Sequence, residues 1–276
     1  MELWVTEYQT PALGFSCKIS ETLRTEQTEF QHLSVVVTEQ FGRMLLLDGM
    51  VQTTEKDEFV YHEMISQVAL NSHPSPEQVL IIGGGDGGSL REVVRHPAVK
   101  RGVLVEIDDR VVQAARDFFP DLSCSFSEPG AEVVIADGIQ YVKDHKNTFD
   151  VILVDSTEPV GPAVELFSPG FYQDCFNALK EDGILVVQSE SPFFNDDVIK
   201  MAYGGIKQFF PITKLYLANI PTYPSGLWSF TVGSKTHDPE SLKNVNVKSG
   251  RYYTPELHQA AFKLPGFVQN ILKNGE

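Results

Sequence analysis

The residues with the clearest chemical potential form the glycine-rich run 83–88 (GGGDGG), which directly follows an apolar stretch at 79–82. An apolar run that ends in glycines is typical of a buried strand turning into a helix, where a nucleotide can approach the backbone closely. Asp86 is unusual in such a loop, because two unit charges ~4 Å apart repel by about 4 kcal/mol at an effective dielectric of about 20. The run therefore favours a nucleoside bearing a positive charge over pyrophosphate, and argues against most nicotinamide and flavin cofactors.

Further carboxylates stand at or just after the ends of the apolar runs that follow. Glu106 and Asp155 each end such a run, Asp137 directly follows another, and Glu158 comes three residues after Asp155. The carboxyl ends of parallel strands meet at one edge of a doubly wound sheet, and ligands bind there. We therefore expect these acids to gather with Asp86 around a single ligand.

Each of these acids has a functional and a structural interpretation. Glu106 lies about 20 residues after the glycine run, the placement of an acid that accepts hydrogen bonds from ribose hydroxyls, or it belongs to an acidic helix start. Asp137 either caps the next helix or accepts from an adenine amino group. Asp155 opens a segment at 156–169 that is rich in proline and glycine, and its length suits a mobile lid.

A second group of candidates lies outside the strand ends. Tyr61 and His62 fall on a predicted helix, and Gln31 begins a predicted strand; isolated residues of these types are more often structural. Tyr223 lies between the last two predicted strands, and Trp228 lies at the start of the second of them. They belong to the core or, beside carboxylates, suit an alkylammonium ligand.

The first 55 residues, approximately, read as strands joined by tight turns. Phe41-Gly42 and Asp48-Gly49 separate three short apolar runs, and Asp-Gly between such runs is a strong hairpin signal. We expect a small antiparallel sheet that packs on the rest of the chain or on a second subunit, because few strands are stable alone.

The remainder alternates between strand and helix patterns, after a helix at about 57–71. Such alternation predicts an α/β, Rossmann-like, mostly parallel sheet with helices on both faces, as in methyltransferases. We assign residues 1–56 to an N-terminal β-strand domain and 57–276 to the Rossmann-like domain. The predicted strands are 79–82, 102–106, 133–136, 151–155 and 184–188, with 212–218 and 227–234 as closing strands for which an antiparallel direction is favoured. The predicted helices are 89–96, 110–118, 139–144, 169–180 and 196–209.

Composition limits the partners and the compartment. The chain has 276 residues, a formal net charge of −15 and a pI near 4.9, which opposes nucleic acid or an anionic membrane as a partner. Three widely spaced cysteines form no C-x-x-C pattern and indicate reduced thiols. Neither a secretory signal nor about 20 consecutive apolar residues is visible, so we expect a cytoplasmic protein.

Four motifs in order resemble those of the spermidine synthases, the polyamine aminopropyltransferase family. They are 83–88 (GGGDGG), 105–108 (VEID), 136–138 (ADG) and 155–162 (DSTEPVGP), and the likeness extends to 61–63 (YHE) and 223–226 (YPSG). The resemblance covers nearly the whole chain. It implies an N-terminal β domain, a Rossmann-like catalytic domain and a homodimer or homotetramer.

The resemblance also implies a reaction and a set of site residues. An aminopropyl group passes from decarboxylated S-adenosylmethionine to putrescine, giving spermidine and 5′-methylthioadenosine. The donor is a co-substrate, so no cofactor is expected, and no metal is expected either. Asp155 is implied as the proton acceptor. The implied amine-binding residues are His62, Asp86 and Glu158, with Tyr61 and Tyr223 lining the channel, and the implied nucleoside-binding residues are Gln31, Glu106, Asp137, Gly138 and Pro162.

One departure from the family pattern leaves the acceptor open. The family usually has Asp where this chain has Glu158, which keeps the charge but extends its reach by one methylene. Agmatine, spermidine or another amine is therefore a second possibility for the acceptor. The same acids would also suit an amine N-methyltransferase built on the same sheet, or a polyamine-binding module without turnover.

Overall fold

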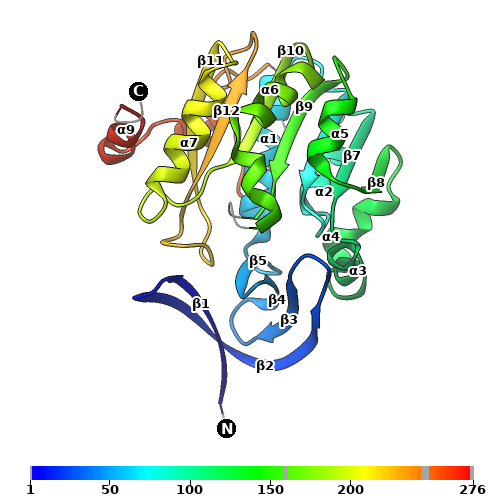
Figure 1. The fold of residues 1–276 in the computed structure, drawn as a ribbon, viewed down its shortest axis with the longest axis vertical. Helices are drawn as coiled ribbons and strands as arrows, with labels where there is room; N and C mark the ends of the chain where they lie inside the picture. The colour runs from blue at the N-terminus through cyan, green and yellow to red at the C-terminus, as the bar shows by residue number, and fades with distance from the viewer. Residues whose placement is uncertain (1, 158–160, 244–248, 274–276) are drawn as a thin grey trace.

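The computed structural model describes residues 2–157, 161–243 and 249–273, which form two β-sheets and their helices (Figure 1). The smaller sheet holds the N-terminal strands and lies below the larger sheet in that view. No helix within the described ranges is both long and apolar enough to cross a membrane.

The small sheet is antiparallel throughout, with its five strands in chain order. Both predicted hairpins are confirmed, and at the second one Asp48 and Gly49 have φ of 49° and 82°. Positive φ at both central positions matches the right-handed twist of the flanking strands. The strands are β1 (Leu3–Thr10), β2 (Leu13–Gln27), β3 (His32–Thr38), β4 (Gly42–Leu47) and β5 (Met50–Thr54).

The large sheet has seven strands in the order β11-β12-β10-β9-β6-β7-β8. The five strands from β10 to β8 run parallel, whereas β12 pairs antiparallel with both β10 and β11. The predicted direction of the closing strands is therefore confirmed. The strands are β6 (Gln78–Gly83), β7 (Arg101–Glu106), β8 (Ala131–Ile135), β9 (Phe149–Asp155), β10 (Leu179–Gln188), β11 (Ile212–Asn219) and β12 (Leu227–Ser234).

The chain order reverses at β6, which has β7 on one side and β9 on the other. Such a switch point opens a crevice at the carboxyl ends of the strands. Here those ends carry the glycine run after β6, Glu106 on β7 and Asp155 on β9. The topology thus brings together the three segments that the sequence singled out.

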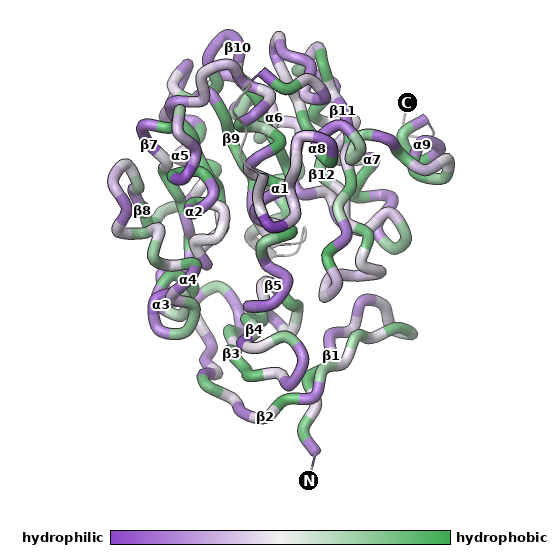
Figure 2. Tube along the Cα trace, turned by 180° about the vertical axis from the view of Figure 1, so that it is seen from behind, coloured by the Kyte–Doolittle hydropathy of each residue, from purple (hydrophilic) through white to green (hydrophobic). Residues whose placement is uncertain are grey.

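Helices cover both faces of the large sheet. Alternate strand residues enter different cores: Ile81 packs in the core that contains residues of α1 and α2, and Ile82 in the core that contains residues of α5, α6 and α7. Figure 2 shows α1, α2 and α8 in front of the sheet, whereas Figure 1 shows α5, α6 and α7. The helices are α1 (Glu58–Ser72), α2 (Gly88–Arg95), α3 (Asp109–Phe118), α4 (Pro120–Ser123), α5 (Gly138–Asp144), α6 (Pro169–Ala178), α7 (Asp196–Lys207), α8 (Pro255–Ala261) and α9 (Gly266–Lys273), with 3₁₀ turns η1 (Cys124–Ser127) and η2 (Gly161–Phe167).

Several predicted boundaries were wrong. The helix predicted over 169–180 ends at Ala178, because Leu179 already pairs with Phe149 of β9. The strand predicted at 133–136 lies at 131–135, and α4, α8 and α9 were not predicted. The pair Thr254-Pro255 was an overlooked sequence signal for the start of α8. In the structure Thr254 caps this helix by accepting a hydrogen bond from the Leu257 amide, and Pro255 takes the first helical position.

The small sheet packs on the large unit. Leu33, Val35 and Leu45 share a buried apolar cluster with Val111 and Phe119, which lie in and just after α3. This confirms that the small sheet does not stand alone. The division into domains at residues 56 and 57 stays a prediction.

Candidate active site

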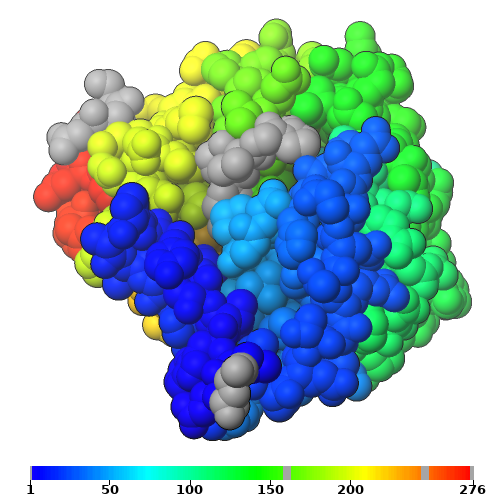
Figure 3. Space-filling view, turned by 60° about the horizontal axis from the view of Figure 1, so that its bottom comes forward, coloured from blue at the N-terminus to red at the C-terminus, as the bar shows by residue number. Residues whose placement is uncertain are grey.

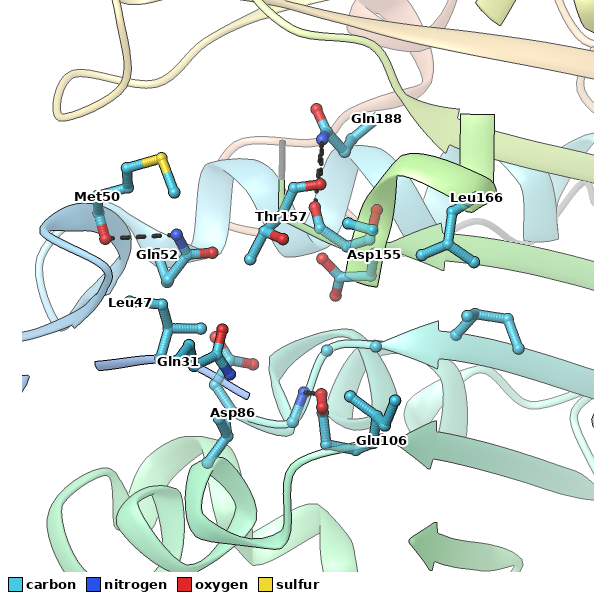
Figure 4. A pocket seen from close by; sticks show the side chains of 18 of the residues that line it. Gln31, Leu47, Met50, Gln52, Asp86, Glu106, Asp155, Thr157, Leu166 and Gln188 are labelled. Atoms are coloured by element: carbon cyan, nitrogen blue, oxygen red, sulfur yellow. Dashed lines mark hydrogen bonds between the residues drawn. The ribbon is translucent and has the colours of Figure 1, made fainter. Parts of the chain in front are cut away.

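A pocket at the switch point is lined by both sheets. Figure 3 shows the blue N-terminal segments seated against the green and yellow parts of the chain. Figure 4 shows Asp86, Glu106 and Asp155 around one cavity, with Gln31 from the segment before β3 among them. Nine of the predicted site residues line this pocket: Gln31, Tyr61, His62, Asp86, Glu106, Asp137, Gly138, Asp155 and Tyr223.

The glycine run lets the loop after β6 approach β9 closely. Gly83 has φ of +81°, and a Cβ there would lie 2.2 Å from the backbone oxygen of Asp155. The Gly84 amide donates to that same oxygen at 2.8 Å. A side chain on Gly83 would therefore displace the strand end that carries Asp155.

Asp155 is held by two hydroxyl donors. Tyr61 Oη donates to Oδ1 at 2.7 Å, and Ser89 Oγ donates to Oδ2 at 2.6 Å. Burial raises the pKa of Asp155, with the nearby charge of Asp86 acting in the same direction. Both hydrogen bonds to the ionised form act in the opposite direction. The result is a fixed carboxylate with a stronger affinity for a proton than an exposed aspartate has.

Asp86 is fixed from two sides. Its Oδ1 accepts a hydrogen bond from the Gly88 amide at 2.8 Å, and its Oδ2 lies 3.3 Å from Nε2 of His62. Nδ1 of His62 lies 2.7 Å from Glu58. Burial would lower the pKa of His62, but Asp86 and Glu58 outweigh it and hold that pKa well above its usual range. His62 is therefore an imidazolium between two carboxylates.

The charged chain continues away from the pocket through Glu58. Arg91 donates to both oxygens of Glu58, at 3.1 and 2.9 Å, and to Glu92 at 2.9 Å. Burial alone would raise the pKa of Glu58, but His62 and Arg91 lower it to about 2. Charges of alternating sign thus run from Arg91 through Glu58 and His62 to Asp86.

Glu106 lines the opposite side of the pocket. Its oxygens accept from the Gly85 amide at 3.2 Å and from the Asp108 amide at 3.0 Å. The structure places Asp108, not Glu106, at the start of α3, where it accepts from the Arg110 amide. Burial raises the pKa of Glu106 to about 7.

Three further predicted residues line the pocket on the same side as Glu106. Asp137 caps α5, accepting from the Ile139 amide at 2.8 Å, and it also lines the pocket. The capping interpretation is confirmed, and the adenine interpretation stays a prediction. Gln31 donates from Nε2 to Asp108 at 3.0 Å. Gly138 packs against β6, where a Cβ would lie 2.6 Å from Ile82.

Aromatic rings form a wall beside Asp155. The ring centroid of Tyr223 is 5.6 Å from that of Tyr61 and 4.7 Å from that of Trp228. Tyr223 Oη donates to the Gln52 backbone oxygen at 2.6 Å, which ties the loop before β12 to the small sheet. Rings beside carboxylates provide a surface for an alkylammonium chain.

Residues 58–246 match the family described as Spermine/spermidine synthase domain, and residues 3–55 match the Spermidine synthase tetramerisation domain. The chain belongs to the spermine/spermidine synthase family. The polyamine aminopropyltransferases of Caldicellulosiruptor bescii and Shouchella clausii are 55% and 52% identical to it over 275 and 276 residues. These alignments cover 99% of this chain in both cases, and 99% and 100% of the relatives.

Solved structures of the family share the fold. A spermidine synthase in complex with the transition state analogue AdoDATO has a TM-score of 0.94 and 45% identity, covering 99% of this chain and 95% of that one. The spermidine synthase of Thermotoga maritima has a TM-score of 0.91 and 44% identity, covering 98% and 94%. As a member of this family, the chain is an enzyme of the aminopropyltransferase class.

Two predicted site residues of the family pattern cannot be placed by side chain. Glu158 lies outside the described residues, and Pro162 is placed only by its backbone, in η2. The predicted lid at 156–169 is described in part, as η2 and its flanks. Its mobility stays a prediction.

Sequence reasoning missed four residues in and around this pocket. Ser89 holds Asp155, Glu58 contacts His62 and is itself held by Arg91, and Gln188 lines the pocket. Gln188 had a usable signal, because it ends a predicted strand as Glu106 and Asp155 do. No spacing in the sequence pairs Arg91 with Glu58.

Proposed function

We propose that this enzyme transfers the aminopropyl group of decarboxylated S-adenosylmethionine to putrescine, giving spermidine and 5′-methylthioadenosine. The observation that carries the proposal is the meeting of Asp86, Glu106, Asp137 and Asp155 in one pocket beside the glycine loop. This pocket offers acceptors for both the amines and the hydroxyls of such substrates. The relative bound to AdoDATO supports the same chemistry.

The acceptor amine must lose a proton before it can react. A primary alkylamine resembles the lysine side chain, which has a pKa of about 10.4. Roughly one amine molecule in two thousand is therefore neutral at pH 7. Asp155 first attracts the ammonium and then accepts its proton, and burial makes this carboxyl a better base than an exposed one. The amine lone pair then forms the new C–N bond.

The donor supplies the carbon and takes up the electron pair. As the nitrogen attacks the methylene next to sulfur, the C–S bond breaks and its electrons neutralise the sulfonium. Orientation of nitrogen, methylene and sulfur in line supplies most of the acceleration. Carboxylates near the sulfur would stabilise the charged donor more than the transition state, so we place Asp86 and Asp155 at the amines.

We assign the remaining residues to the nucleoside side and the amine side of the pocket. Glu106 accepts from the ribose, with Gln31, Asp137, Gly138 and Pro162 around the nucleoside. Tyr61, Tyr223 and Glu158 line the amine side. Both ring nitrogens of His62 face carboxylates, so His62 acts on the amine through Asp86.

Product analysis tests the proposal. The purified enzyme is incubated with decarboxylated donor and putrescine, agmatine or spermidine, and every product is identified by mass. Spermidine and methylthioadenosine are expected from putrescine. Turnover should be lost in Asp155→Asn and should stay at the wild-type level in the exposed control Asp144→Asn. A preference for another amine would correct the acceptor, and S-adenosylhomocysteine from unmodified S-adenosylmethionine would indicate a methyltransferase instead.

A further inference from the structure

Three side chains with metal-binding atoms meet at the edge of the large sheet that lies away from the pocket. His73 follows α1 directly, Asp182 lies in the first half of β10, and His237 follows β12. Nε2 of His73 is 3.4 Å from Oδ2 of Asp182, and Nε2 of His237 is 3.5 Å from the same oxygen. All three atoms lie within 4.8 Å of one another, the one such group of three in the described part of the chain.

The two histidine–aspartate separations are longer than typical hydrogen bonds and match the spacing of two ligands on one ion. N–H···O hydrogen bonds cluster near about 2.9 Å. Ligands at about 2.0–2.2 Å from a tetrahedral Zn²⁺ lie roughly 3.3–3.6 Å apart, by the geometry of the tetrahedron. Nε2 of His237 is also buried from solvent, with no hydrogen-bond partner among the described residues.

We propose that His73, Asp182 and His237 form a binding site for a divalent transition-metal ion, with Zn²⁺ as the best match. Two imidazoles and a carboxylate suit this ion, and water completes four-coordination. The Asp182 side chain is 42% exposed, which gives an ion access from solvent. The site is separate from the transfer reaction, for which we expect no metal.

The tautomer of His73 sets one cost of metal binding. Nδ1 of His73 accepts from the Ser75 amide at 3.1 Å, so the neutral ring carries its proton on Nε2, facing Asp182. For Nε2 to bind a metal, that proton must move to Nδ1, which breaks the hydrogen bond from the Ser75 amide and leaves that amide to water.

The bound ion would join three elements that also form the pocket. His73 lies eleven residues beyond His62, about 16 Å along α1 at 1.5 Å per residue, and Gln188 ends the strand that carries Asp182. The ion is too far from the pocket to touch the substrates. It would instead stabilise the ends of α1, β10 and β12 against separation.

Calorimetric titration of the EDTA-treated, full-length enzyme with ZnCl₂ tests this proposal. We expect one ion per chain and a Tm increase of about 5 °C at saturating metal. Co²⁺ in the same site should show the visible absorption of a tetrahedral ion. His237→Ala and Asp182→Asn should each weaken binding at least roughly tenfold, the loss of one ligand interaction.

Control variants distinguish metal binding at this site from binding elsewhere on the protein. His32→Ala removes an exposed histidine elsewhere and should leave the affinity unchanged, and circular dichroism confirms that each variant folds. Failure to bind Zn²⁺, or equal binding by His237→Ala, would overturn the site. Asp155→Asn should bind Zn²⁺ as the wild type does, so the result is independent of the transfer activity.

Discussion

The Ser89 hydroxyl donates a 2.6 Å hydrogen bond to Oδ2 of Asp155, from the first turn of α2 to the end of β9. Ser89 is fully buried, so water cannot replace this donor. A hydrogen bond to the ionised carboxylate lowers its pKa and opposes the effect of burial. Ser89 therefore fixes both the position and the basicity of the proposed proton acceptor.

We expect Ser89→Ala to lower kcat about tenfold, the equivalent of one hydrogen bond. Loss of the donor raises the pKa of Asp155, so the acidic limb of the kcat–pH profile should move to higher pH. Steady-state kinetics between pH 6 and 9 measure both effects. The exposed control Ser127→Ala should match the wild type, and a slower variant with an unmoved profile would argue against this role.

Methylthioadenosine binding should weaken as the pH falls through about 7, the pKa to which burial raises Glu106. Ribose hydroxyls stabilise the ionised carboxylate, so binding lowers this pKa and affinity rises with pH until Glu106 is fully ionised. We expect the affinity for methylthioadenosine to change by about threefold to tenfold between pH 6 and 8, which corresponds to the loss of one hydrogen-bond acceptor. Calorimetry should show that the affinity of Glu106→Gln does not vary with pH. The exposed control Glu128→Gln should keep the pH dependence of the wild type.

Asp86 should govern the choice between the two forms of the donor. S-adenosylmethionine carries a carboxylate that Asp86 repels, whereas the decarboxylated donor presents an ammonium there. Asp86→Asn keeps an acceptor for the Gly88 amide but loses the charge, so the ratio of the two dissociation constants should shrink about tenfold. An unchanged ratio in Asp86→Asn would rule out this role of Asp86. The exposed control Asp144→Asn should keep the wild-type ratio.

The Glu58 carboxylate should stabilise the fold above pH 4.5. Its pKa falls from 4.5 to about 2 in the folded chain, worth about 3 kcal/mol. Because the folded pKa is depressed, this stability is present above the unfolded pKa and disappears as the pH falls through the folded value. Urea unfolding should therefore show Glu58→Gln less stable at pH 7, with a smaller difference at pH 3.

A matched variant separates this pairing from a general charge effect. The exposed Glu21→Gln removes the same charge and should stay within about 0.5 kcal/mol of the wild type at both pH values. An equal loss of stability for Glu58→Gln at pH 7 and pH 3 would contradict the linkage. In that case the cost would come from packing and not from ionisation.

The edge hairpin β1–β2 should mediate assembly into dimers or tetramers. Trp4 and Tyr8 of β1 are 56% and 76% exposed, and residues 3–55 match a tetramerisation domain. Charge at these positions would oppose burial between subunits, so Trp4→Glu with Tyr8→Glu should yield a smaller species in light scattering. Glu21→Lys, an exposed charge change on β2 at a position that pairs with β3 and not with β1, serves as the comparison.

Local signals determined much of the fold. The apolar runs, the Asp48-Gly49 turn and the alternation of strand and helix specify elements through contacts between near neighbours. They also place acids at successive strand ends, which is why nine predicted site residues line the pocket. Boundaries such as Ala178 and short helices such as α8 escaped prediction because long-range strand pairing and packing decide them.

The sequence by itself thus determined the parallel sheet, its glycine loop and the acids at its edge, since each follows from patterns a few residues long. Only the tertiary structure decided the partners of those acids. Ser89 reaches Asp155, and Arg91 reaches Glu58, across gaps of 66 and 33 residues. Such contacts depend on how α1 and α2 pack on the sheet, and packing sets the burial that shifts each pKa.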